Sequence, residues 1–221
     1  MSPTIWFLTS NAGKLAEAGN HLSALGYEVK QLVVQEGVLY EPQAETLEEV
    51  AKSKISQARQ HLPSNFSTSD MILVEDAGLF IDALDGFPGV YSSYVYSTIG
   101  NAGIIRLLNH LTTEDPVSSA SLRSARFTAV AALWRDGEVM FGEGVCPGHI
   151  ATASMEGQGF GFDPIFIPCD LDDNLNPLSP GNYGSHSTHG KTFGAVDSAV
   201  KQKFSHRSRA LQNLFNQLPS A

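Results

Sequence analysis

The sequence of 221 residues has few cysteines and few basic side chains. Its two cysteines, Cys146 and Cys169, lack the spacing of a CxxC motif, which predicts reduced thiols and argues against a disulfide framework. Lysine and arginine together number 14 against 23 acidic residues, which gives a net charge of −9. General binding to nucleic acid or to an anionic membrane requires a basic surface, so the charge argues against both. A small anionic ligand is not excluded, because it needs only a local cluster of cations.

The sequence also lacks the features of a signal peptide and of a membrane-spanning helix. The opening residues, MSPTIWFLTSN, have neither a basic stretch nor a long apolar stretch, so we expect no signal peptide. No apolar run approaches the roughly 20 residues that a membrane-spanning helix needs. We therefore expect a cytoplasmic protein that binds neither nucleic acid nor membrane.

The residues that are present suffice for a globular core, since 42% are hydrophobic and 17% are charged. A β-rich run over 4–9 is followed by helical spacing over 11–25, and a second helical stripe covers 46–62. Residues 124–145 contain two strand patterns joined by an Asp-Gly turn. These patterns predict an α/β fold with a mixed central β-sheet flanked by helices. No good linker divides the chain, so we expect one domain over 1–221.

Three segments close the sequence. Residues 168–190 are rich in proline, glycine, serine and asparagine, which predicts a long and mobile surface loop. Residues 193–204 and 205–218 then follow helical patterns.

Two predicted helices begin with cations, which the positive end of a helix dipole disfavours. Asn11 is a plausible N-cap that places Lys14 at the third helical position, and Ser205 is a plausible N-cap before His206 and Arg207. Backbone N–H groups and a cation at a helix start can together bind phosphate. The alternative for each cation is an ordinary solvated side chain. The stretch TSNAGK has a single glycine, so it is not the P-loop of a kinase or ATPase.

Three further charged residues stand at positions where the pattern predicts an apolar environment. Lys54 falls on the apolar stripe of its helix, where it either extends outward along its stem or reaches into a cleft. Glu75 and Asp76 follow the apolar run MILV, which predicts a buried strand that ends at these acids. Adjacent strand residues point to opposite faces, so only one of the two can face a given cleft. Asp76, at the strand end, is the better candidate for chemistry, and Glu75 suits a supporting role or an ion pair. Two solvated charges in a turn are the alternative.

Acids among cations suit a polyphosphate ligand, because Mg²⁺ binds a few carboxylates together with phosphate oxygens. The segments involved also resemble those of a known family. They are TSNAGKLAEA (9–18), the spacing from Glu41 to Lys54, VEDAGLFIDALDGFPGVYSS (74–93), ARF (125–127), PGHI (147–150), GQGFGFDPIF (157–166) and KQKFSHRSRAL (201–211). Over nearly its whole length the chain resembles the inosine triphosphate pyrophosphatases, also called XTP/dITP diphosphatases. That family hydrolyses non-standard purine nucleoside triphosphates to the monophosphate and pyrophosphate, and so cleans the nucleotide pool.

The resemblance implies a purine nucleoside triphosphate substrate, Mg²⁺ as the cofactor, two lobes around a nucleotide cleft, and a homodimer. It implies that the triphosphate is bound by Thr9, Ser10, Asn11, Ala12, Gly13, Lys14, Lys54 and Ala77. The base pocket that it implies is lined by Phe160, Gly161, Phe162 and Asp163. Base and phosphates would also be contacted by Lys201, His206 and Arg207, the last two favouring a 6-oxo purine.

The resemblance also implies a mechanism. Glu41 and Asp76 would hold the metal while water attacks the α-phosphorus and pyrophosphate leaves. Asp76 is the implied proton acceptor, and because metal binding weakens a carboxylate as a base, Glu75 can contribute.

Two positions depart from the family pattern. Ser10 stands where glycine is usual, and Ala77 stands where serine or threonine is usual. The missing hydroxyl at position 77 would donate to a phosphate oxygen, so activity is expected to be low unless the Ala77 backbone N–H or Ser10 replaces it. A pyrophosphatase of the related Maf type, acting on other modified nucleotides, is one alternative function. A nucleotide-binding protein with weak catalysis is another.

Overall fold

The computed structural model describes residues 3–35, 37–40, 42–155, 157 and 159–218. The helices are α1 (Ala12–Ser23), α2 (Leu47–Ala58), α3 (Ser92–Thr98), α4 (Gly100–Leu107), α5 (Pro116–Leu122), α6 (Ser198–Phe204) and α7 (His206–Phe215). The strands are β1 (Thr4–Phe7), β2 (Glu28–Gln31), β3 (Met71–Ile81), β4 (Ser124–Arg135), β5 (Glu138–Ile150) and β6 (Phe166–Pro168). Among the described residues, no helix is both long and apolar enough to cross a membrane.

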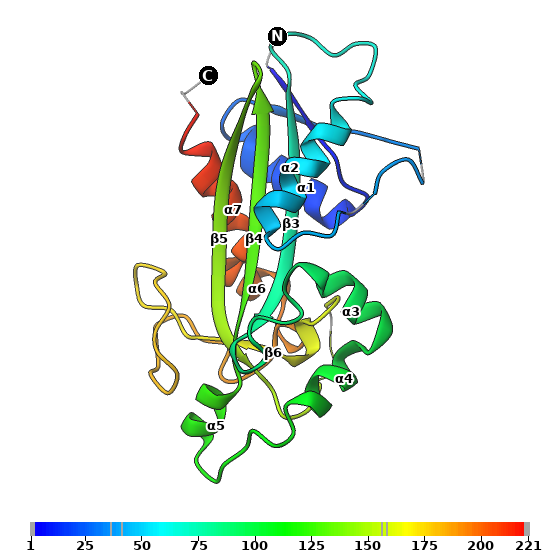
Figure 1. Ribbon diagram of the computed structural model, residues 1–221. Coiled ribbons are helices and arrows are strands. Elements are labelled where there is room, and N and C mark those ends of the chain that lie inside the picture. Colours follow the sequence, from blue (N-terminus) through cyan, green and yellow to red (C-terminus); the bar gives the residue numbers. More distant parts are fainter. Residues whose placement is uncertain (1–2, 36, 41, 156, 158, 219–221) are drawn as a thin grey trace. The chain divides into compact units, whose positions relative to one another are not determined.

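The six strands form one sheet in the order β2-β1-β3-β4-β5-β6 (Figure 1). β1 pairs in parallel with both β2 and β3, whereas β5 pairs antiparallel with β6. Between β4 and β5, Asp136 and Gly137 both have positive φ, 52° and 94°, as a two-residue type I′ hairpin requires. The prediction of an α/β fold with a mixed sheet and flanking helices is confirmed.

The contacts divide the chain into two compact units. The first unit is Met1–Ala77, Ala129–Gly144 and Arg207–Ala221, and the second is Gly78–Thr128 and Val145–His206. The single domain over 1–221 and the nucleotide cleft stay predictions.

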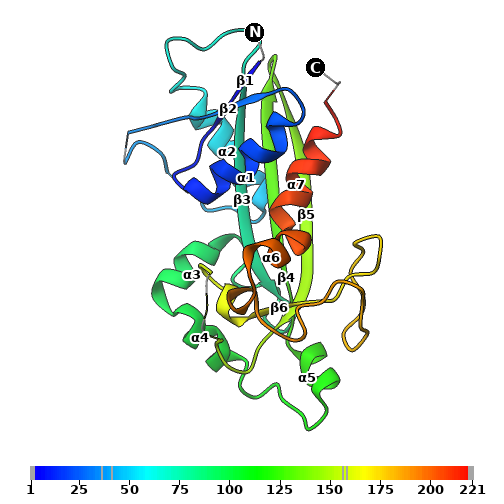
Figure 2. The same cartoon turned by 180° about the vertical axis from the view of Figure 1, so that it is seen from behind.

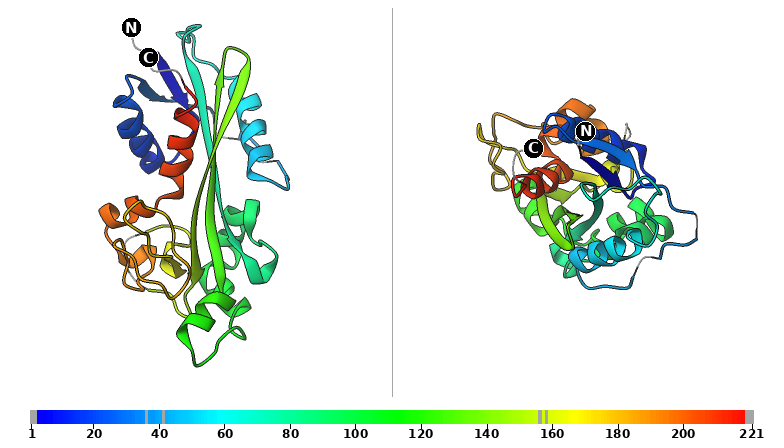
Figure 3. Two further views of the ribbon diagram at one scale, coloured as in Figure 1. Left: turned by 90° about the vertical axis from the view of Figure 1, so that its left-hand side faces the viewer. Right: turned by 90° about the horizontal axis from the view of Figure 1, so that it is seen from above.

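In the first unit, helices cover both faces of the sheet. Figure 3 shows α1 and α7 together against one face and α2 against the other, and Figure 2 shows α1 and α7 from their own side. The core under α1 and α7 includes Leu22, Leu214, Phe7 and Leu73. The neighbouring strand residue Ile72 is also fully buried but lies outside that cluster, because successive side chains of a strand alternate between faces.

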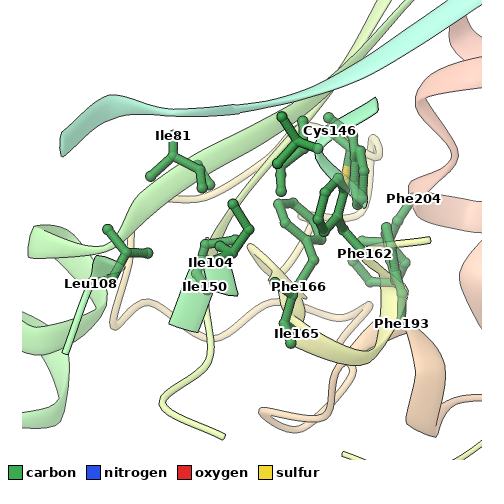
Figure 4. Packing of buried hydrophobic residues seen from close by; sticks show 14 of the residues in the cluster. Ile81, Ile104, Leu108, Cys146, Ile150, Phe162, Ile165, Phe166, Phe193 and Phe204 are labelled. Atoms are coloured by element: carbon green, nitrogen blue, oxygen red, sulfur yellow. The ribbon is translucent and has the colours of Figure 1, made fainter. Parts of the chain in front are cut away.

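The second unit has its own core, which is rich in aromatic side chains (Figure 4). Phe127 and Phe166 lie with ring centroids 4.6 Å apart, and Phe193 lies 5.3 Å from Phe166. Arg123 is buried beside this core and donates hydrogen bonds to the carbonyl oxygens of Ile150 (2.7 Å), Leu108 (2.6 Å) and Ala151 (2.8 Å). The guanidinium thus joins the residue that follows α4 to the end of β5.

The predicted end of the strand at Asp76 is wrong, since β3 continues to Ile81. The strand continues through Ala77 and Gly78. The following Leu79 and Ile81 are fully buried in the core, and their burial stabilises the extended chain. Gly78 is needed there, since a Cβ at this position would lie 2.3 Å from the carbonyl oxygen of Gly89.

The loop predicted over 168–190 is present, but it is anchored. Leu171 is buried in the core of the second unit and its backbone forms bridges with Pro177 and His186. Cys146 and Cys169, both among the described residues, form no disulfide, as predicted. The helices α3 and α5 had no predicted counterpart.

Helix α7 also lies close to β5 in the first unit. Asn213 Nδ2 donates to the carbonyl oxygen of Glu143 (2.8 Å), and Gln217 Nε2 donates to that of Phe141 (2.7 Å). Between them is Gly142, where a Cβ would lie 2.3 Å from the carbonyl oxygen of Ala210. The missing side chain is therefore what permits this approach.

Replacing Gly142 with alanine should lower the free energy of unfolding by about 1–3 kcal/mol, the usual cost of overpacking. The control is Gly19→Ala in α1, where nothing lies within 4 Å of an added Cβ. This control should raise stability by about 0.5–1 kcal/mol, because glycine is a poor helix former. Denaturant unfolding measures both variants, and equal stability of the two would contradict the close approach of α7.

Candidate active site

The described site residues form separate groups, each within one unit. The first begins at the start of α1, where Asn11 is the N-cap as predicted and Lys14 is the third helical residue. Asn11 Oδ1 accepts hydrogen bonds from the N–H groups of Gly13 (2.9 Å) and Lys14 (3.2 Å), and Thr9 Oγ1 accepts one from the N–H of Asn11 (3.1 Å). Backbone donors that were expected to be available for phosphate are thus already bonded within the segment.

Lys14 extends from this helix to a buried carboxylate. Its Nζ lies 2.6 Å from Glu75 Oε2, whose side chain is 0% exposed. The same ammonium lies 3.4 Å from the Glu75 carbonyl oxygen. Arg207, in the first turn of α7, places its Nε 3.2 Å from the same carboxylate oxygen. One buried acid therefore holds a cation from each of two helices.

Asp76 lies next to Glu75 in sequence and is bound from the opposite face of β3. Lys54 Nζ is 2.6 Å from Asp76 Oδ1, and the two side chains are only 20% and 15% exposed. Lys54 projects from α2, which begins at a capping box formed by Thr46 and Glu49. The Lys54 ammonium thus reaches an acid of β3, and its place in a nucleotide cleft stays a prediction.

Within the described part of the first unit, the ion pairs bring together the cations Lys14, Lys54 and Arg207 and the acids Glu75 and Asp76. Water is largely excluded from Glu75, so the electrostatic interactions around it are stronger than on an open surface. Lysine and arginine side chains gathered in this way are the groups that bind phosphate and carboxylate oxygens. Ala77 lies on the Glu75 side of β3, half-buried against the core under α1 and α7.

The fit of a metal ion depends on the carboxylates. Among the residues that the structure describes, no three histidine, cysteine or acidic side chains cluster as a metal site. Mg²⁺ does not need such a cluster, because it commonly binds one or two carboxylates plus substrate phosphates. Asp76 can supply one of them, so the donor chemistry fits. Glu41, the other predicted ligand, lies outside the described residues.

A second group lies within the second unit. Lys201 Nζ is 2.6 Å from Asp163 Oδ2, and it lies 5.0 Å from the ring centroid of Phe160 and 5.4 Å from that of Phe193. Asp163 is 4% exposed, whereas Phe160 is 58% exposed and presents its ring to solvent. An exposed aromatic face beside a partly buried ion pair suits a flat heterocycle with polar edges.

His206 is 9% exposed and stacks on Phe127, with ring centroids 5.0 Å apart and planes at 12°. The predicted start of a helix after Ser205 is confirmed, since α7 begins at His206. The roles predicted for His206, Arg207 and the other site residues in substrate binding and catalysis stay predictions.

Sequence reasoning missed residues that support the second group. Phe193 lies under Lys201, the ring of Tyr96 meets Phe162 edge-on at 5.5 Å, and Asn101 Nδ2 donates to the carbonyl oxygen of Gly161 (3.2 Å). The partners of Tyr96 and Asn101 are far away in the sequence, so no local pattern indicated these two contacts.

Comparison with known proteins identifies the family. The family model of the Ham1 family matches residues 5–217. A dITP/XTP pyrophosphatase of Thermococcus kodakarensis is 40% identical over 212 residues, which cover 96% of this chain and 95% of that protein. One of Pyrococcus horikoshii is 38% identical over 214 residues, with 97% and 96% covered.

Solved structures agree with the sequence comparison. A HAM1 protein from Coxiella burnetii matches with a TM-score of 0.69 and 25% identity, covering 97% of each chain. A nucleoside-triphosphatase, dITP/XTP pyrophosphatase, from Mycobacterium abscessus matches with a TM-score of 0.64 and 28% identity, covering 95% of this chain and 97% of that one. The match over residues 5–217 shows that the chain belongs to the Ham1 family.

Proposed function

We propose that this protein hydrolyses non-standard purine nucleoside triphosphates, namely ITP, dITP and XTP, to the monophosphate and pyrophosphate. The observation that supports this most is the buried Glu75 with Lys14 and Arg207 on one carboxylate oxygen. The names of the similar proteins, dITP/XTP pyrophosphatases, support the same substrate class. A cytoplasmic role in cleaning the nucleotide pool and a homodimer belong to the same proposal.

In this proposal the cations of the first unit bind the triphosphate. Lys14 and Arg207 are held by a carboxylate that is 0% exposed, so their positions are set before substrate arrives. A preorganised cation loses little conformational freedom on binding, which favours affinity. Since Glu75 is buried, it acts as a positioning residue for both cations and not as the base that meets water.

Asp76 is the residue that we assign to the reacting water. Its carboxylate is partly exposed and bonded to Lys54, so it can orient a water molecule for attack on the α-phosphorus while Lys54 offsets negative charge. Asp76 and Glu41 would hold Mg²⁺, which when bound supplies charge neutralisation and a more acidic water. Pyrophosphate is the leaving group.

The second-unit group binds the base. Phe160 offers its exposed ring for stacking, and the ion pair of Asp163 with Lys201 supplies polar atoms to the edge of the heterocycle. A site that forms hydrogen bonds with a 6-oxo purine leaves polar groups unpaired when a 6-amino purine enters, so ATP is rejected.

The first prediction concerns substrates. With Mg²⁺ present, pyrophosphate release from ITP, dITP and XTP should exceed release from ATP by about 100-fold or more in kcat/KM. Malachite-green detection after coupling to an inorganic pyrophosphatase measures the product, and omission of the metal is the control. Equal turnover of ITP, GTP and ATP would contradict the proposed specificity. Turnover of modified pyrimidine nucleotides alone would favour the Maf type.

Asp76→Asn should lower kcat by about 10²–10⁴-fold, the range for loss of a group that handles a reacting proton or water. The matched control is Asp82→Asn, which removes another acid paired with a cation, Arg126, but with a side chain that is 58% exposed. Steady-state kinetics with ITP compare the two variants. Unchanged turnover in Asp76→Asn would remove Asp76 from the mechanism.

Ala77→Ser should raise kcat/KM for ITP by about 10- to 100-fold, because a charge-assisted hydrogen bond to phosphate contributes roughly 1.5–3 kcal/mol. The new hydroxyl would lie on the same side of β3 as Glu75 and its cations. Ala77→Val, similar in width but without a donor, is the control. If ITP binds tightly to the wild type without turnover, and the serine variant restores turnover, the wild type is a nucleotide-binding protein with weak catalysis.

A further inference from the structure

The short segment 159–163 of the second unit, here called the base loop, has a conformation that needs support. Gly161 has a φ of +61°, in the left-handed region, and Gly159 has a φ of +159°. The loop closes on itself, because the N–H of Phe160 donates to Asp163 Oδ2 (3.0 Å) and the N–H of Asp163 donates to the carbonyl oxygen of Phe160 (3.2 Å). Glycine keeps many conformations open, so a stretch with two glycines depends on such bonds to stay in one conformation.

A side chain from α4 supplies a further bond to this loop. Asn101, the second residue of α4, donates from Nδ2 to the carbonyl oxygen of Gly161 at 3.2 Å. Next to it, Tyr96 of α3 places its ring edge-on to Phe162, with centroids 5.5 Å apart and planes at 84°. The contacts from α3 and α4 thus reach two successive residues of the base loop.

The other half of the Asn101 amide is not used. Its Oδ1 is buried and has no hydrogen-bond partner among the described residues. A buried acceptor without a partner costs free energy, which offsets what the bond from Nδ2 contributes. An apolar side chain of the same shape would pack there at no such cost. Asparagine at this position is thus a poor choice for stability, and its value must come from the one bond that it makes.

We propose that Asn101 is a positioning residue that fixes the base loop for purine binding by its hydrogen bond to Gly161. This inference rests on the proposed function, in which the base loop contacts the purine. A loop fixed beforehand loses less conformational entropy when the base binds, so the bond increases substrate affinity without taking part in the reaction. The side chain acts through Gly161 and does not touch the reacting atoms.

The kinetic test uses Asn101→Leu, which keeps the approximate shape and removes the donor. KM for ITP should rise about fivefold, the ratio expected for one ordinary hydrogen bond, while kcat stays within about twofold. The Tm of the variant should be equal to or above that of the wild type, since the unpaired acceptor is also removed. Asn101→Ala provides a second variant if the leucine does not fit. Asn109→Ala, an exposed asparagine beyond α4, is the control and should change neither KM nor Tm.

A second readout does not depend on activity. Hydrogen exchange of the protein without substrate should be faster at the amides of Phe160 and Asp163 in Asn101→Leu than in the wild type, because both amides are bonded inside the base loop. Exchange in α2, in the first unit, should be unchanged and serves as the internal reference.

Three outcomes overturn the inference. They are an unchanged KM with unchanged exchange, a fall in Tm that accompanies the change in KM, and an equal loss of kcat and kcat/KM. The proposed function fails separately, if the wild type releases no pyrophosphate from ITP, and in that case the exchange experiment still decides whether Asn101 holds the loop.

Discussion

The ion pairs of Glu75 are the interaction on which the first unit depends. A carboxylate with a side chain exposure of 0% is stable only when nearby cations and hydrogen bonds compensate for the lost water. Here the compensation comes from Lys14 of α1 and Arg207 of α7, two helices that pack on the same face of the sheet. Removing one partner of such a buried pair typically costs about 3–5 kcal/mol, because the remaining charge stays buried.

Because β3 is pleated, its two adjacent acids lie in different environments and pair with different cations. Glu75 faces α1 and α7, whereas Asp76 faces Lys54 of α2. This follows from the alternation of strand side chains, and it explains why one residue can be fully buried while its neighbour keeps some contact with solvent. A shift of one residue in the register of β3 would exchange these environments and separate every ion pair of the group.

Structural features that depend on a few consecutive residues could be predicted from the sequence, whereas features that depend on distant residues could not. The cap at Asn11, the helix starting after Ser205 and the Asp-Gly hairpin were predicted because each depends on a few consecutive residues. The continuation of β3 beyond Asp76 was missed, because Ala77 and Gly78 look like a strand end until Gly89 is known to pack against them.

The same limit applies to the site. Lys14 and Lys54 stood out through their positions on helices, but the sequence could not say which cation pairs with which acid. That choice is made by the docking of α1, α2 and α7 on the sheet. Arg123 and Asn101 were missed for a similar reason, since each bonds to carbonyl groups whose positions depend on the tertiary fold.

The ion pairs of Glu75 with α1 and α7 also form in a set order while the protein is being synthesised. During synthesis Lys14 and Glu75 emerge from the ribosome well before Arg207, which lies much later in the sequence. Until α7 has left the exit tunnel, only α1 can pack on the face of the sheet that holds Glu75. At that stage Glu75 also lacks Arg207, one of its two cations. Contacts between such distant parts of a sequence form late in folding. The set of charges around Glu75 is therefore complete only after α7 (His206–Phe215) has been synthesised and has packed on the sheet.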